Sequence, residues 1–281
     1  MYGAIIGDIV GSKFEFDRGS KTREFELFTS VDTFTDDTVM TCAVAEAIMD
    51  AGRNSSEGKM KAYIVDAMKR WGKMYPDAGY GGRFREWLRS SAPKPYGSYG
   101  NGSGMRVSSV GWFYESLDKT LEVARWSAEV THNHPEGVKG AEAVAGAIYM
   151  ARKGASFCEI KAFWESPRIG YDLSRTLDEI RPTYHHVESC QETMPEAFTC
   201  FLESSANLLG EAGFERTIRN VAYIGGDVDT LGAIAGAVAE AYFGVPSDMA
   251  AKARTYLDSE IKDVVMRFYR EIGISLAVEA S

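Results

Sequence analysis

Residues 225–244, GGDVDTLGAIAGAVAEAYFG, are the stretch that does most to predict the fold. From Ala233 to Gly244 this stretch is rich in alanine and glycine, and a second segment of the same kind, AEAVAGAIYMA, spans residues 141–151. Small side chains allow neighbouring helix backbones to approach closely. In a globular chain such stretches indicate buried central helices and not a membrane dimer motif. We therefore expect each of the two stretches to form a buried central helix that its neighbours can approach closely.

Apolar residues recur at helical spacing along most of the remaining chain. A helix is expected from Asp37 to a stop at Gly52, and another over 57–74 places Met60, Ile64 and Trp71 on one face. Further helices are expected at 83–90, 104–116, 118–130, 136–152, 156–164, 193–208, 213–223, 229–243 and 247–273. Alternating strand patterns are almost absent. The sequence predicts an all-α fold, with residues 1–281 forming a single domain.

Composition and charge exclude several functions. The chain has 31 basic and 40 acidic residues and a formal net charge of −9, which argues against a nucleic-acid scaffold. It has no run of 18 apolar residues, and its apolar start lacks a basic region, so we expect neither a membrane span nor a signal peptide. The four cysteines are far apart and lack zinc-ligand spacing. These features predict a reduced, cytoplasmic protein.

Two acidic clusters each stand directly before an apolar helix: Thr35-Asp36-Asp37-Thr38 and Gly225-Gly226-Asp227-Val228-Asp229-Thr230. Helix capping is one interpretation, because Thr and Asp are good N-caps and acids suit the positive end of a helix. Capping explains only one Asp in each cluster, and the second adds like-charge repulsion. A hard divalent cation would resolve that repulsion, because it accepts several carboxylate and hydroxyl oxygens. Taken together, the clusters favour two Mg²⁺ or Mn²⁺ ions balanced by four carboxylates.

Two glycine-rich segments are typical of places where backbone approaches a ligand. Residues 7–15 are GDIVGSKFE, and residues 97–104 are GSYGNGSG, directly before an expected helix at Met105. The amides of the second segment could hold a phosphate or diphosphate. A plain surface loop is the alternative. The segment matches neither a P-loop nor a dinucleotide-binding fingerprint, because no Gly-Lys-Ser/Thr follows it and no strand precedes it.

These motifs together resemble the ADP-ribosylglycohydrolase family, which includes the dinitrogenase-reductase-activating glycohydrolase and the ADP-ribosyl-acceptor hydrolases. The matching blocks occur in the family order: GDIVGSKFE (7–15), TDDT (35–38), GSYGNGSGMR (97–106), SAEVTHNHPEG (127–137) and GGDVDTLGAIAGAVAEAYFG (225–244). The resemblance implies a compact orthogonal bundle of helices with a binuclear Mg²⁺ or Mn²⁺ centre at the base of an ADP-ribose cleft. The metal ligands it implies are Thr35, Asp36, Asp37, Asp227, Asp229 and Thr230.

The resemblance also implies roles for other residues. Glu15 falls on a flexible-loop glutamate that acts as the acid/base or as a gate near the scissile bond. Asp36 and Asp229 are expected to be catalytic together with it. His132 falls on a histidine that holds the distal ribose. The diphosphate would lie on the loop formed by Gly97, Ser98, Tyr99, Gly100, Asn101 and Gly102. Val228 departs from the family pattern, which usually has Thr or Ser between the two aspartates.

The function implied is removal of ADP-ribose from an ADP-ribosylated protein by a metal-dependent hydrolase, with the protein acting as a monomer. Two alternatives remain open from the residues. A binding module could hold ADP-ribose or a metal without hydrolysis, and an enzyme of this kind could act on a small ADP-ribose derivative. The presence of Glu15 and of all four metal aspartates favours the enzyme.

Overall fold

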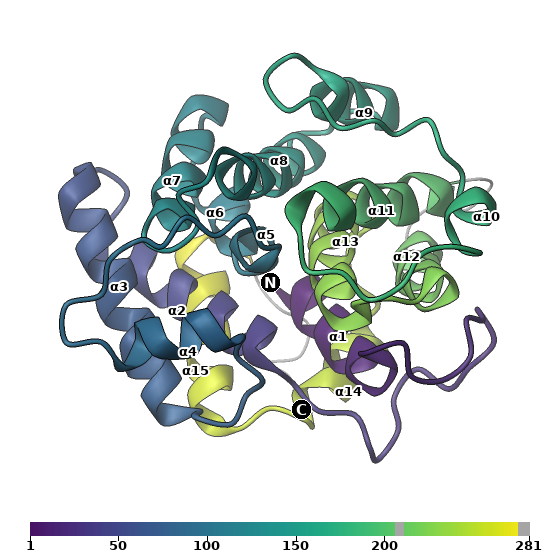
Figure 1. Cartoon of the computed structure of the whole chain (residues 1–281), viewed down its shortest axis with the longest axis horizontal. Coiled ribbons are helices and arrows are strands. Elements are labelled where there is room, and N and C mark those ends of the chain that lie inside the picture. The colour runs from purple at the N-terminus through teal and green to yellow at the C-terminus, as the bar shows by residue number, and fades with distance from the viewer. Residues whose placement is uncertain (206–210, 275–281) are drawn as a thin grey trace.

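Two helices that pack backbone against backbone form the centre of the fold. The computed structural model describes residues 1–205 and 211–274, and in Figure 1 α1 (Tyr2–Gly11) crosses α13 (Val228–Phe243) in the middle of the molecule. A Cβ built on Gly7 would lie 1.9 Å from the carbonyl oxygen of Gly232, and one on Gly3 would lie 2.1 Å from that of Gly236. Only glycine allows this approach. The expected central helix at 229–243 is therefore present, and its partner α1 is a helix that periodicity did not predict.

The other helices surround this pair. The second alanine-rich helix, α8 (Pro135–Arg152), is also largely buried, as expected. Figure 1 shows α2, α3, α4 and α15 on one side of the central pair and α11 and α12 on the other. The remaining elements are α2 (Asp36–Ala51), α3 (Glu57–Met74), α4 (Gly82–Arg89), α5 (Gly102–Met105), α6 (Ser108–Phe113), α7 (Leu117–Glu129), α9 (Phe157–Glu165), α10 (Leu177–Ile180), α11 (Cys190–Leu202), α12 (Glu211–Ile224), α14 (Ser247–Arg254) and α15 (Ser259–Glu271), with short 3₁₀ turns at Ser12–Phe14 and Glu203–Ser205.

Some expected helices differ from the observed ones. The segment 104–116 is two short helices, α5 and α6, separated at Arg106 and Val107. The segment 247–273 is also divided, because Asp258 accepts a hydrogen bond from the Ile261 amide and begins α15 as a new helix. Residues 206–208, the end of the helix expected over 193–208, lie outside the described residues.

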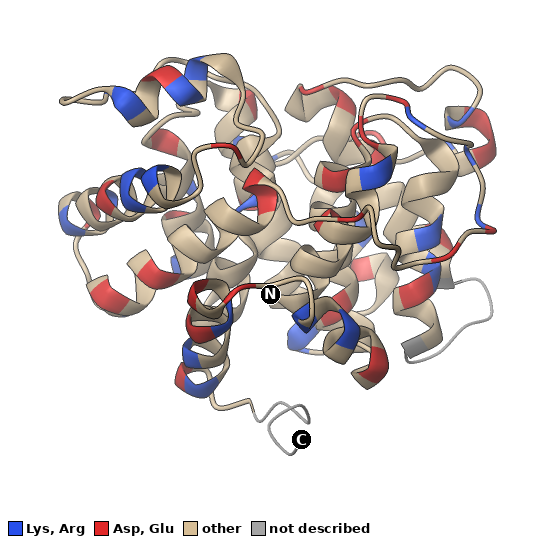
Figure 2. Cartoon of the chain, turned by 90° about the horizontal axis from the view of Figure 1, so that it is seen from below, with Lys and Arg blue, Asp and Glu red and all other residues tan. Residues whose placement is uncertain are grey.

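The fold is all-helical, with no strand among the residues that the structure describes. Figure 2 shows the charged residues mainly on the peripheral helices and loops, while the central helices are mostly uncharged. None of the helices described is both long and apolar enough to cross a bilayer. An isolated bridge between Gly100 and Ser189 joins the glycine-rich loop to the start of α11.

Candidate active site

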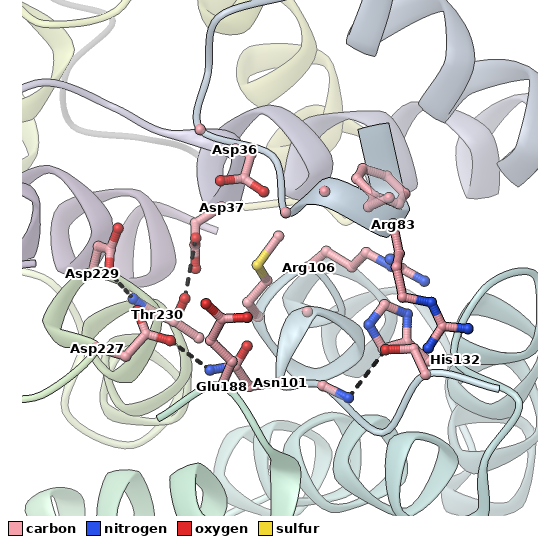
Figure 3. Close-up of a pocket in the computed structure, with 18 of the residues that line it drawn as sticks. Asp36, Asp37, Arg83, Asn101, Arg106, His132, Glu188, Asp227, Asp229 and Thr230 are labelled. Carbon is pink, nitrogen blue, oxygen red and sulfur yellow. Dashed lines mark hydrogen bonds between the residues drawn. The ribbon is translucent and has the colours of Figure 1, made fainter. Parts of the chain in front are cut away.

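A cleft of about 300 Å³ opens above the N-terminal ends of α2 and α13. Figure 3 shows that its two sides differ in charge: the acidic residues gather on one side, and Arg83, Arg106 and His132 lie on the other. Its acidic lining consists of Glu15, Asp36, Asp37, Glu188, Asp227 and Asp229, together with Thr230. The glycine-rich loop contributes Ser98, Gly100, Asn101 and Gly102. We call these two regions the acidic end and the loop end.

At the acidic end, the fold brings together carboxylates that are nearly 200 positions apart in the chain. Carboxylate oxygens of Asp8, Asp37 and Asp229 all lie within 4.8 Å of one another. Thr230 donates a hydrogen bond from Oγ1 to Asp37 Oδ2 at 3.3 Å, which joins the start of α13 to the start of α2. Asp227 Oδ2 accepts a hydrogen bond from Asn101 Nδ2 at 2.6 Å, and this contact joins the acidic end to the loop (Figure 3).

Asp8 is a buried acid of the site that the sequence analysis did not select. Its carboxylate accepts hydrogen bonds from the backbone amides of Thr35 and Thr38 at 2.9 and 3.0 Å, and from their hydroxyls at 2.8 and 2.6 Å. Because the Thr35 hydroxyl donates its hydrogen bond to Asp8, its oxygen acts as an acceptor toward other groups, and it accepts a hydrogen bond from the Asp37 amide at 3.3 Å. The signal for Asp8 was present in the sequence, since one acid inside the apolar run of residues 1–10 must be buried with partners.

Capping does not use up the carboxylates of the two clusters. The N-cap of α2 is Thr35, whose side chain accepts a hydrogen bond from the Asp37 amide. Asp227 is the N-cap of α13, yet its side chain makes no capping hydrogen bond. Asp37 Oδ1 is buried and has no hydrogen-bond partner at all. The capping interpretation therefore accounts for Thr35 and leaves the paired aspartates unexplained.

The electrostatics of the acidic end fit a divalent cation. No Lys or Arg forms an ion pair with these aspartates in the described part of the chain, and the nearest basic group is His186, whose Nδ1 lies 4.0 Å from Asp227 Oδ1. Burial, with repulsion from Asp8 and Asp227, raises the pKa of Asp36 to about 8. Burial and neighbouring carboxylates likewise raise the pKa values of Asp37 and Asp229 well above the usual range. Uncompensated carboxylates and an unpartnered buried oxygen are what hard divalent ions neutralise.

Glu15 lies at the mouth of the acidic end, directly after the 3₁₀ turn Ser12–Phe14. The next two residues, Phe16 and Asp17, have positive φ angles of 57° and 58°, a conformation that costs energy for residues other than glycine. Contacts with His186 hold this turn: its amide donates to Asp17 Oδ2 at 2.9 Å, and its ring lies 4.8 Å from that of Phe16. Burial and the charge of Asp227 raise the pKa of Glu15 above its usual value.

The loop end differs in part from what the sequence predicted. The short helix α5 begins at Gly102 and not at Met105. Three loop amides are already used within the protein: Gly97 donates to Asn133 Oδ1, Gly100 to Ser98 Oγ, and Asn101 to the Glu188 carbonyl. Gly97 and Tyr99 do not line the cleft.

Two of these residues illustrate how the loop is built. Gly97 has φ 67°, which favours glycine, and the Tyr99 side chain is 51% exposed and contacts His134 at 5.5 Å between ring centroids. The amides of Ser98 and Gly102 have no hydrogen bond to another described residue, so they remain available to a ligand. The loop therefore offers fewer free amides than its sequence suggested.

His132 lies beneath this loop, with two guanidinium groups near it. A Cβ on Gly102 would lie 3.3 Å from His132 Nε2, and one on Gly100 would lie 3.5 Å from it, so the glycines allow the ring to touch the loop. Arg106 is fully buried and has no acidic partner among the described residues, whereas Arg83 is exposed and lies over the Tyr96 ring at 4.7 Å. Neither arginine was a candidate from sequence: Arg83 lies outside the quoted motifs, and Arg106, at the end of the block 97–106, was given no role there.

Comparison with known proteins agrees with this architecture. A family model described as ADP-ribosylglycohydrolase matches residues 1–275, so the chain belongs to the ADP-ribosylglycohydrolase family. It is 26% identical to human ADP-ribosylhydrolase ARH3 over 93% of this chain and 90% of that protein, and 27% identical to the protein of the same name from Gallus gallus over 87% and 84%.

Among solved structures, an "ADP-ribosylglycohydrolase-related protein complex" superposes with a TM-score of 0.69 at 21% identity, covering 96% of this chain and 95% of that one. This likeness shows a shared fold. The family match, with the ADP-ribosylhydrolase relatives, makes the protein a glycohydrolase of the ADP-ribosylglycohydrolase family.

Proposed function

We propose that this member of the ADP-ribosylglycohydrolase family is a metal-dependent hydrolase that removes ADP-ribose from the side chains of ADP-ribosylated proteins. The observation that carries the proposal is the division of one cleft into an acidic end and a loop end (Figure 3). ADP-ribose has a matching division, because a neutral ribose diol lies at one end and an anionic diphosphate follows it. Carboxylates that repel a phosphate suit a metal-bound diol, and amides beside two guanidinium groups suit the diphosphate.

The acidic end would hold two Mg²⁺ or Mn²⁺ ions through Asp36, Asp37, Asp227, Asp229, Thr35 and Thr230. When bound, such ions supply Lewis-acid stabilisation of negative charge on oxygen. The chain's own residues prepare this site. Asp8 accepts the hydrogen bond of the Thr35 hydroxyl, and the Asp37 amide uses one lone pair of this oxygen, so one lone pair is left for a metal ion. Asn101 orients Asp227 by donating to Oδ2. Such supporting hydrogen bonds fix the direction of ligand oxygens.

Glu15 would exchange the proton of the reaction. Its carboxyl group borders the cleft beside Asp36 and Asp227, and burial and the charge of Asp227 raise its pKa above the usual value, which favours proton exchange by this group. One carboxyl can thus give a proton to the leaving side chain or take one from the attacking water. The strained turn at Phe16 and Asp17, held by His186, keeps Glu15 at the mouth of the acidic end.

The test is release of ADP-ribose from proteins modified on Arg, Ser or Cys, with Mg²⁺ or Mn²⁺ and with a chelator. We expect release from at least one of these substrates and only with metal. Asp227→Asn should abolish it, and Asp66→Asn, which changes an exposed acid of α3, should not. Release in the presence of chelator would refute the metal requirement. Tight ADP-ribose binding without release from any substrate would make the protein a binding module.

A further inference from the structure

A short series of buried hydrogen bonds connects Arg106 to the ring of His132. Arg106 Nη2 donates to Thr131 Oγ1 at 2.8 Å and to the Ser127 carbonyl at 2.8 Å. Thr131 Oγ1 lies 2.6 Å from His132 Nδ1. The side chains of all three residues are nearly or fully buried: Arg106 is 1% exposed, Thr131 0% and His132 6%. None of these contacts was expected from the sequence, since Arg106 and Thr131 are 25 residues apart.

The position of the single Thr131 hydroxyl proton follows from these contacts. Arg106 has only donors, so Thr131 Oγ1 must accept that hydrogen bond. The hydroxyl can then donate to His132 Nδ1 at 2.6 Å or to the Ala128 carbonyl at 3.5 Å. The shorter contact is the much stronger bond, and a hydroxyl that accepts from a cation is a better donor. Nδ1 of His132 is therefore the acceptor.

The charge state of the ring agrees with this assignment. Burial, together with the positive charges of Arg106 and Arg83, lowers the pKa of His132 well below its usual 6.5. A neutral imidazole carries one proton, so a ring whose Nδ1 accepts must carry that proton on Nε2. Nε2 is the atom that faces Gly100 and Gly102 in the loop end of the cleft.

We propose that Thr131, held by Arg106, is a positioning residue that fixes His132 as the Nε2–H tautomer and so directs a hydrogen-bond donor at an anionic or hydroxyl oxygen of the ligand in the loop end. The identity of that ligand as ADP-ribose rests on the proposed function, whereas the tautomer does not. An unprotonated Nε2 would repel a phosphate oxygen, whereas Nε2–H can donate a hydrogen bond to it. The tautomer therefore decides whether the loop end can bind an anionic oxygen at this ring.

The direct test is nitrogen-15 NMR of the histidine rings, because protonated and bare ring nitrogens resonate far apart. The chain has only four histidines, and His132→Asn identifies the signals of this ring. We expect one neutral Nε2–H tautomer for His132 in the wild-type protein at about pH 7. The Nδ1–H tautomer, or a charged ring, would overturn the proposal, and this measurement needs no variant of Thr131 to fold.

Two substitutions then test Thr131 itself. Thr131→Val removes the hydroxyl at nearly constant shape and should give mixed tautomers, with ADP-ribose binding in Mg²⁺ weakened roughly 10-fold, as for loss of a hydrogen bond to a charged group. Thr131→Ser keeps the hydroxyl and should therefore retain both the single Nε2–H tautomer and the wild-type affinity for ADP-ribose. Thr120→Val is the matched control, because that buried hydroxyl donates only to the Ser116 carbonyl.

Unchanged tautomer and affinity in Thr131→Val would overturn the positioning role. If the wild-type protein failed to bind ADP-ribose at all, the proposed function would fail, and the NMR spectra would still decide the tautomer. The two failures are thus distinguishable.

Discussion

Removing metal should make the stability of this protein fall as pH rises. In the metal-free fold, burial raises the pKa values of Asp8, Asp36, Asp37, Asp227 and Asp229. Repulsion from neighbouring carboxylates adds to this effect at Asp36, Asp37 and Asp229. A carboxyl whose pKa is higher in the folded state binds its proton more tightly there than in the unfolded chain. Its stabilising contribution is complete below the unfolded pKa and is lost as pH rises through the folded pKa.

Asp36 gives the scale of the effect. Its pKa is 3.8 in the unfolded chain and about 8 in the fold. At 1.36 kcal/mol for each pH unit, the three units between about pH 5 and about pH 8 amount to roughly 4 kcal/mol. This is an upper limit for Asp36, because its side chain is partly exposed and water screens its charge. For a chain of 281 residues, 4 kcal/mol corresponds to a change in Tm of about 7 °C.

The assay is thermal unfolding at several pH values between about 5 and 8, with chelator and with millimolar Mg²⁺ or Mn²⁺. With chelator, Tm should fall across this range. With metal, the positive charge of the ions compensates the ionised carboxylates. The fall of Tm with pH should then largely disappear, and Tm at pH 8 should be higher than with chelator. Comparing the two series cancels the contribution of ionisable groups elsewhere.

Asp36→Asn provides an internal check on this reasoning. It should flatten the pH dependence of the metal-free protein, raise its Tm at pH 8 and reduce the stabilisation by metal. Two results would refute the electrostatic reasoning. One is a Tm of the metal-free protein that rises with pH as the Tm of the metal-loaded protein does, and the other is a Tm that metal does not change at any pH.

Three further predictions concern the framework of the site and its acid. In urea unfolding, Gly7→Ala should destabilise the fold by about 3 kcal/mol or more, because its Cβ would lie 1.9 Å from the Gly232 oxygen. The control is Gly58→Ala in α3, where nothing lies within 4 Å of the added Cβ, and it should stabilise the fold by about 0.5–1 kcal/mol. Asp8→Ala should lower the free energy of unfolding by about 3–6 kcal/mol, because it leaves buried amides and hydroxyls without an acceptor. Asp8→Asn should lower it much less, since its amide oxygen can still accept the three hydrogen bonds now made to Oδ2. Equal losses of stability in the two variants would contradict this reasoning. Glu15→Gln should reduce turnover by roughly 10²–10⁴ while calorimetry finds ADP-ribose affinity within a few-fold of wild type; a parallel loss of both would mean that Glu15 orders the site.

The sequence predicted the helices that carry a strong period or a clear cap, but not the helix that another element stabilises. The segment 57–74 was predicted with its observed bounds, since its apolar face is narrow and regular. Helix α1 has no side-chain cap and is buried on all sides, so it lacks a polar face to give it a period. Its three glycines, which would weaken an isolated helix, are explained only by the backbone of α13 against them.

The site was predictable to the extent that its residues stand together in the chain. Adjacent carboxylates signalled an unusual site because their repulsion is visible in the sequence itself. Residues that act through a partner elsewhere in the chain gave no such signal. Arg106 looks like any arginine until its burial without an acid is known, and the contact of Thr131 with His132 Nδ1 depends on a ring orientation that no spacing encodes.

Helix α1 explains why two acidic clusters so far apart in sequence meet in one place. Asp8 binds the turn Thr35–Thr38 through four hydrogen bonds, which fixes the start of α2 on one side of α1. On another side, a Cβ on Gly11 would lie 2.5 Å from the Asp229 Cα, so the start of α13 rests directly against the backbone of α1. The spacing between the clusters is therefore set by a glycine and an acid three residues apart on one helix. Any substitution that moves α1 must change fold stability and the spacing of the proposed metal ligands together, because the same backbone contacts determine both.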